Sequence, residues 1–146
     1  MAHFPQVATL FASATRATAI ANSGGTAVPN IGAGKRVMVL LDVTATAGVA
    51  GDTLSVYVDM LAPDGVTWIN AGRFTTVAGD SAAIKHWMSL SEAAAPAATT
   101  FDVTADCNAG VTKPYVWGSA IRGRYTLLDA GAHGQSVTFS LSAIIQ

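Results

Sequence analysis

The sequence predicts an all-β protein: an antiparallel β-sandwich, jelly-roll-like or Ig-like, formed as a single domain over residues 1–146. Apolar and polar residues alternate with a period of two in several stretches, and β-branched residues are frequent within them. Turn signatures rich in glycine, proline and aspartate separate these stretches. No internal repeat and no long linker divides the chain.

The middle of the chain carries the clearest pattern. Valine and leucine alternate with other residues over 35–44, and both faces of this stretch stay apolar as far as Asp42, which predicts a central strand. Two glycines in 47–52 predict a turn before the next alternating run at 54–60. A Pro-Asp-Gly turn then leads into a return strand through Trp68. The prediction is a three-stranded antiparallel meander over residues 35–74.

Further strands are predicted on both sides of this meander. The clearest is C-terminal, at 135–145, with five apolar residues facing inward against serines and threonines. The remaining segments are assigned as strands at 6–12, 83–90 and 115–128, a weak polar edge strand at 13–21, a loop at 22–34, and turns at 75–81 and 129–134. An N-terminal arm (1–5) and a long excursion (91–114), interrupted by Pro96, complete the domain.

Composition limits the possible partners. Hydrophobic residues make up 51% of the chain and charged residues 12%, against roughly 25% charged in ordinary soluble domains. No apolar run approaches the ~18 residues that a membrane helix needs, so no membrane partner is expected. A net charge of −1 gives no basic field for nucleic acid. Since charge is depleted where chains cover one another, the composition predicts an assembly component that forms a homo-oligomer.

The single cysteine, Cys107, excludes an internal disulfide, and the N-terminus lacks the pattern of a secretion signal. We therefore expect the chain to mature in a reducing cytoplasm.

Catalytic and metal signatures are sparse. His3, His86 and His133 are far apart, and no nucleophile elbow, phosphate loop or dinucleotide fingerprint occurs, so we expect no enzyme and no cofactor. Oxygen ligands at short spacing make Asp102, Asp106 and Asn108 a weak Ca²⁺ candidate, with a solvated polar loop as the alternative.

Aromatic and basic residues supply the candidates for contacts between chains. Trp68, Trp87 and Trp117 would form a sugar-stacking platform, an interface hot spot or plugs at the ends of the core. Arg122 and Arg124 project from one strand face, where they would pair with a neighbouring chain's carboxylates or remain solvated. The full set of interface candidates is Phe4, Pro5, Ile31, Trp87, Pro96, Phe101, Tyr115, Trp117, Arg122 and Arg124.

Short, weakly charged strand segments spread over most of the chain carry a family resemblance. They are FASATRAT at 11–18, VLLDVTATAG at 39–48, DGVTW at 64–68, IRGRY at 121–125 and VTFSLSA at 137–143. Together they resemble the small structural virion proteins of tailed bacteriophages.

That resemblance implies a capsid decoration or cement protein on the capsid surface of the virion, made in the host cytoplasm. Its partners would be the major capsid protein and further copies of itself, as a homo-oligomer that is most simply a trimer. We expect the arm at 1–5, the loop at 22–34 and the excursion at 91–114 to make the contacts between chains.

Other functions remain open at this stage. A tail or neck component of the same particle would have the same composition. A carbohydrate-binding module would need two coplanar exposed tryptophans, and a hydrolase would need histidine and aspartate side chains converging in a pocket.

Overall fold

The computed structural model describes residues 5–31, 36–91, 104–113 and 116–146, and confirms an all-β single domain with two antiparallel sheets packed as a sandwich. The described residues form no helix that is long and apolar enough to cross a membrane. The strands are β1 (Gln6–Arg16), β2 (Ile20–Gly24), β3 (Val28–Pro29), β4 (Arg36–Ala47), β5 (Thr53–Leu61), β6 (Trp68–Arg73), β7 (Val77–Ala78), β8 (Ile84–Ser91), β9 (Ala120–Leu128) and β10 (Ser136–Ile145).

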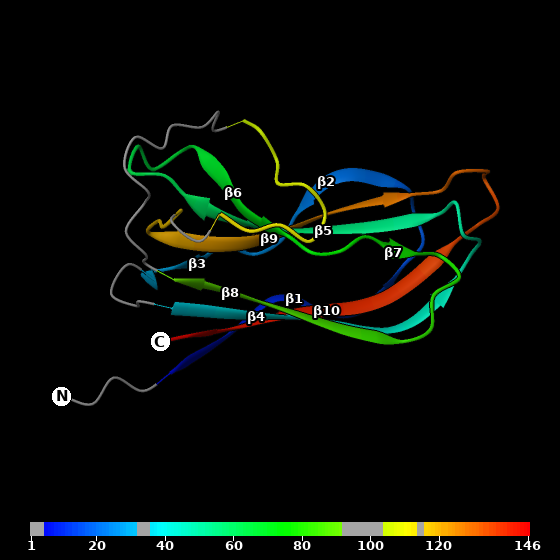
Figure 1. Ribbon diagram of the computed structural model, residues 1–146, viewed down its shortest axis with the longest axis horizontal. Coiled ribbons are helices and arrows are strands. Elements are labelled where there is room, and N and C mark those ends of the chain that lie inside the picture. The colour runs from blue at the N-terminus through cyan, green and yellow to red at the C-terminus, as the bar shows by residue number, and fades with distance from the viewer. Residues whose placement is uncertain (1–4, 32–35, 92–103, 114–115) are drawn as a thin grey trace.

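The strand order defines which kind of sandwich this is. Sheet A has the order β1-β10-β4-β8, and sheet B has the order β2-β9-β5-β6, with β3 added to β9 and β7 added to β5. Figure 1 shows the two sheets as stacked layers. Apart from the two short strands β3 and β7, the pairing is nested along the chain: β1 with β10, β2 with β9, β4 with β8 and β5 with β6. This nesting is the jelly-roll arrangement.

The predicted meander over residues 35–74 is only half correct. β5 and β6 form the expected hairpin, but β4 pairs with β10 and β8 in the other sheet, so the predicted pairing of β4 with β5 is wrong. The cause lies in the connection after β4. The fully buried Asp52 carboxylate accepts hydrogen bonds from the Val49 and Ala130 N–H groups, both at 2.9 Å. These bonds hold the connection against the β9–β10 turn, so it crosses between the sheets.

Several strand boundaries also differ from the prediction. β1 continues to Arg16, because its pairing with β10 persists through two register shifts that interrupt the simple alternation. The weak strand predicted at 13–21 is therefore divided between β1 and β2, and the predicted 22–34 loop contains the end of β2 and all of β3. The strand predicted at 115–128 begins at Ala120.

The core lies between the sheets. The inward residues of the C-terminal strand are all buried as predicted, and those of β4 face them from the neighbouring strand. Phe11, Tyr125 and Phe139 meet edge to face, with ring centroids 5.4–5.9 Å apart, and the Arg16 guanidinium lies 4.0 Å from the centre of the Phe139 ring. Gly123 is required beside them, because a Cβ there would come within 2.7 Å of Phe11.

Candidate functional site: the outer face and free edge of sheet A

Part of the outer face of sheet B, around β6, is covered by the chain's own residues 104–113. The Cys107 N–H donates to the side-chain oxygen of the buried Asn70 at 2.8 Å, and the Lys113 N–H donates to the Ala71 carbonyl at 2.7 Å. Thr112 forms an isolated bridge with Gly72. Residues 104–113 therefore lie over β6 and remove both a sheet face and a sheet edge from solvent.

An ionic network holds this covered face together. Asp59 is 2% exposed, and its carboxylate accepts hydrogen bonds from Nε of Arg124 at 3.0 Å and Nε of Arg122 at 3.4 Å. Arg124 also donates to Asp106 at 3.1 Å, in the covering segment. Burial lowers the pKa of Arg124, but the hydrogen bonds and negative charges of Asp106 and Asp59 outweigh this effect. The net result is a pKa above the ordinary arginine value, so the guanidinium stays charged.

This network changes the expectations for several residues. Arg122 and Arg124 bind carboxylates of their own chain, because the covering segment and β5 bring Asp106 and Asp59 to them. Of the Ca²⁺ candidates, Asp106 is bound to Arg124, Asn108 accepts the Val111 N–H through its backbone carbonyl, and Asp102 lies outside the described residues.

The described residues contain no group of three His, Cys, Asp or Glu side chains placed to hold a metal ion. Burial raises the pKa of the Cys107 thiol, although the nearby Lys113 charge opposes the shift.

The outer face of sheet A has a different character. Val7, Ile144 and Met38 lie side by side across β1, β10 and β4, and Leu40 lies beside Trp87 across β4 and β8. Val7 is 73% exposed, Leu40 38% and Trp87 68%. A hollow of about 260 Å³ lies among Met38, Leu40, Trp87 and Ile144. Together with Val7, these residues form a patch that we call the apolar stripe.

Charge on this face lies on both sides of the stripe along β4, because the exposed Arg36 precedes Met38 on the outward side and Asp42 follows Leu40. The Lys85 ammonium binds the Asp42 carboxylate at 2.7 Å, beyond the stripe along β4 and β8. The remaining neighbours on the outward side of β10 are serines and threonines. An exposed apolar patch bordered by small polar side chains is typical of a surface that another molecule covers.

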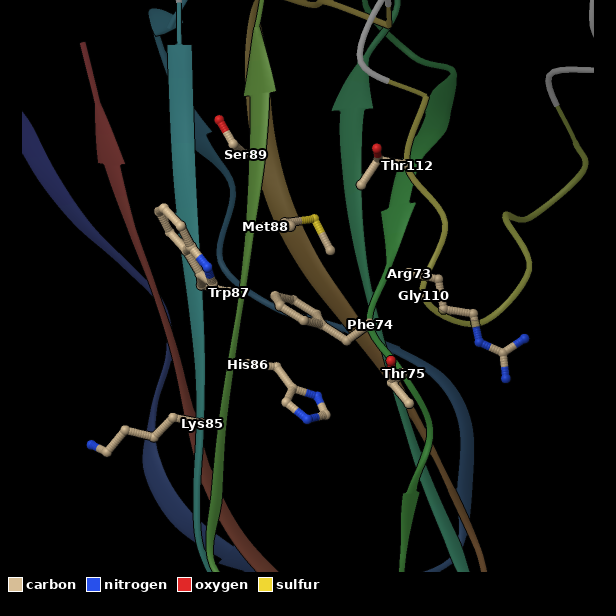
Figure 2. A pocket seen from close by; sticks show the side chains of 10 residues that line it. All are labelled: Arg73, Phe74, Thr75, Lys85, His86, Trp87, Met88, Ser89, Gly110 and Thr112. Atoms are coloured by element: carbon tan, nitrogen blue, oxygen red, sulfur yellow. The ribbon is translucent and has the colours of Figure 1, made fainter.

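A groove of about 420 Å³ runs beside the free edge of β8, between this strand and residues 73–75 and 110–112 (Figure 2). His86 and Met88 point from β8 toward Phe74, whereas Lys85 and Trp87 point to the other side of the strand. The buried Nδ1 of His86 has no hydrogen-bond partner among the residues that the structure describes. The described residues that line the groove include His86 but no carboxylate.

The structure places the predicted interface residues in very different surroundings. Trp87 lies in the apolar stripe, and Pro5 is exposed just before β1. Ile31 is fully buried in the core, where it has no surface to offer a partner. Trp117 packs half-buried against the core. Phe4, Pro96, Phe101 and Tyr115 lie outside the described residues.

The sequence interpretation missed most of the stripe, namely Val7, Met38, Leu40 and Ile144. A signal existed at Met38 and Leu40, because β4 is apolar on both faces as far as Asp42. The core accounts for the apolar residues on one face of β4, but not for those on the other face. Val7 and Ile144 carried no separate signal, since only their pairing in sheet A brings them beside Met38.

No family model and no curated protein matches this chain. Among solved structures, it is similar to a chain in the structure of infectious bursal disease virus Gx strain, with 13% sequence identity and a TM-score of 0.46. The similarity covers 97% of this chain and 32% of that one, so this chain spans about a third of that chain's length. The likeness is too distant to assign a function, and the jelly-roll assignment rests on the strand pairing alone.

Proposed function

We propose that this chain is a structural protein of a bacteriophage virion, a capsid decoration or cement protein that bridges neighbouring major capsid subunits. The observation that carries the proposal is the apolar stripe, an exposed sheet face of Val7, Met38, Leu40, Trp87 and Ile144 in a chain with 12% charged residues. Such a face binds by burial of apolar surface, which needs neither a cofactor nor a reaction.

The rest of the molecule is consistent with a binding role. Among the described residues, most large apolar side chains outside the stripe pack into the core, and residues 104–113 lie over β6, so the outer face of sheet A is the sheet surface best suited to a large partner. A cement protein that touches several shell subunits gains from many weak contacts acting together, because each additional contact becomes intramolecular once the first has formed. Self-association of the bound copies adds to this effect, and the resemblance favours trimers.

The same face would serve a tail or neck protein, and position in the particle separates the two roles. A carbohydrate-binding module is less well supported. Trp87 lies on sheet A, Trp68 lies on sheet B with the Arg122 guanidinium 4.3 Å from its ring centre, and Trp117 packs against the core. The three tryptophans therefore do not form the coplanar exposed pair that sugar stacking requires.

The test is sedimentation of the purified chain with empty heads of the phage that encodes it. We expect co-sedimentation in multiples of three copies, and we expect Leu40→Lys to abolish it, because the new charge would be buried against the shell. The matched control is Val66→Lys, which changes an equally apolar residue, 76% exposed, in the β5–β6 turn. A wild-type chain that ignores heads, or equal binding by both variants, contradicts the proposal.

A further inference from the structure

The edges of the two sheets are not equally protected against pairing with another chain. β1 carries two register shifts, β6 lies under residues 110–113, and β2 has five residues with an irregular register. Bulges, covering segments and short length each hinder the addition of a further strand. Among the described residues, β8 has none of these features. It runs for eight residues in unbroken register with β4 and contains no proline.

The side of β8 that faces away from β4 is open within the described part of the chain. Five consecutive residues, Lys85–Ser89, line the adjoining groove, which happens when the backbone edge of a strand itself borders the space (Figure 2). Strand pairs in sheet A end at β8, so alternate N–H and C=O groups of this strand have no ladder partner there. Such an edge is a template for one more strand.

We propose that β8 pairs with β8 of a second copy of this chain, antiparallel and about a two-fold axis through Trp87, to form one continuous sheet. This goes beyond the proposed function, since it names a contact between copies and not the contact with the shell. The two-fold contact joins copies in pairs and is separate from the threefold association expected of the bound protein. In this register Trp87 lies opposite Trp87 of the second copy, and Lys85 lies opposite Ser89. His86 lies opposite Met88 on the inner side.

The second copy fits because β8 is complementary to itself in this register. A lysine opposite a serine avoids like charges across the strands, and a central aromatic pair is a favourable cross-strand contact. The most exposed aromatic side chain of the stripe, Trp87 at 68%, is then partly covered. The two apolar stripes also become one surface twice as long, which presents more area to a common partner.

Charged substitutions at Ser89 test the register. Ser89→Lys places a lysine opposite Lys85 at two symmetric positions, so we expect the self-association constant to fall on the order of tenfold, measured by sedimentation equilibrium. Ser89→Glu places opposite charges together, and association should not weaken. The control is Thr9→Lys, on the same face at the other edge of sheet A, which should leave association unchanged. Equal effects of the two lysine variants, or a wild-type chain that stays monomeric, overturn the proposal.

A disulfide gives an independent readout. Cβ atoms of directly opposed residues lie about 4.5–5.5 Å apart, close to disulfide reach, so Trp87→Cys should form covalent dimers on mild oxidation. The native Cys107 is buried and interferes little. Thr9→Cys should stay uncrosslinked. A wild-type chain that binds phage heads, together with a Trp87→Cys variant that gives no dimer, refutes the β8 contact and leaves the proposed function standing. Trp87→Cys dimers, together with a wild-type chain that ignores heads, refute the proposed function and leave the β8 contact standing.

Discussion

Part of the outer face of sheet B lies under residues 104–113 of its own chain, whereas the outer face of sheet A has no such cover among the described residues. The side chains differ accordingly. Sheet B places the ionic cluster of Asp59, Arg122 and Arg124 beside the covering segment. Sheet A presents the apolar stripe, with the exposed Arg36 on one side of it and the Lys85–Asp42 ion pair on the other. Three of the four ion pairs within the described part of the chain therefore hold β5, β9 and the covering segment of sheet B together.

The two sheets expose little charge for different reasons. On sheet B, polar groups are buried because the chain itself satisfies them: Asp59, Asn70 and Arg124 form one bonded cluster. On sheet A, apolar side chains remain exposed with nothing from the described chain over them. The first arrangement stabilises the fold, and the second costs solubility unless a partner covers it.

The largest expected difference comes from the two aspartates that form ion pairs on the two faces. Asp59→Ala leaves the nearly buried Arg124 without its main partner and should lower the free energy of unfolding by about 3–5 kcal/mol. Asp42→Ala removes only the partner of the exposed Lys85 and should cost about 0–1 kcal/mol. Urea unfolding of the two variants measures both values. Similar losses would mean that the covering segment does not exclude solvent from Asp59.

A second pair of variants uses neighbouring residues of β4. Leu41 is 1% exposed and faces the core, so Leu41→Ala should lower the free energy of unfolding by about 2–5 kcal/mol. Leu40 faces outward in the stripe, and Leu40→Ala should cost about 1 kcal/mol or less in the isolated chain. Thermal and urea unfolding distinguish these outcomes. If Leu40→Ala proves as costly as Leu41→Ala, sheet A is covered by the chain itself.

The reactivity of Cys107 reports on the cover of sheet B. Burial raises the pKa of this thiol and shields it, so alkylation by iodoacetamide at neutral pH should be at least ~10-fold slower in the native chain than in urea. Asp106→Ala removes the contact between the covering segment and Arg124, and should speed native alkylation. An unchanged rate would show that the hydrogen bond of the Cys107 N–H to Asn70 suffices to hold the segment.

The smallest expected effect concerns the β5–β6 turn at the end of sheet B. A hydrogen bond from the Thr67 hydroxyl, with backbone N–H bonds from Thr67 and Val66, lowers the pKa of the fully exposed Asp64. A lowered native pKa means that the charged form stabilises the fold above the unfolded-state pKa of about 4 and that this contribution is lost as pH falls.

Wild type should therefore melt slightly higher than Asp64→Asn at pH 7, and the gap should close toward pH 2. The exposed Asp80→Asn provides a control with the same change in charge. A gap that stays constant over this pH range would show that the Asp64 charge does not contribute.

Strands β4 and β10 show what an alternating pattern predicts and what it leaves undetermined. The alternation of apolar and polar residues correctly identified both strands and the inward side of β10, because a period of two is a local property of an extended backbone. It did not identify their partners. Residues 47–52 have the glycines of a hairpin turn, yet the buried Asp52 binds the β9–β10 turn and sends the chain into the other sheet.

The candidate site divides in the same way. Trp87 was predicted as an interface residue from its residue type and is exposed, whereas Ile31, which was chosen with it, fills the core. Arg122 and Arg124 share one face as predicted, but their partners, Asp59 and Asp106, come from β5 and from a segment distant in sequence.

By itself, the sequence determined the all-β class, most of the strands and the scarcity of charge, since each depends on neighbouring residues or on composition. Tertiary structure alone decided the nested strand order, the cover over sheet B and the alignment of Val7, Ile144 and Met38. The physical reason is that alternation fixes the side to which each residue points, whereas long-range backbone pairing fixes which residues lie beside it.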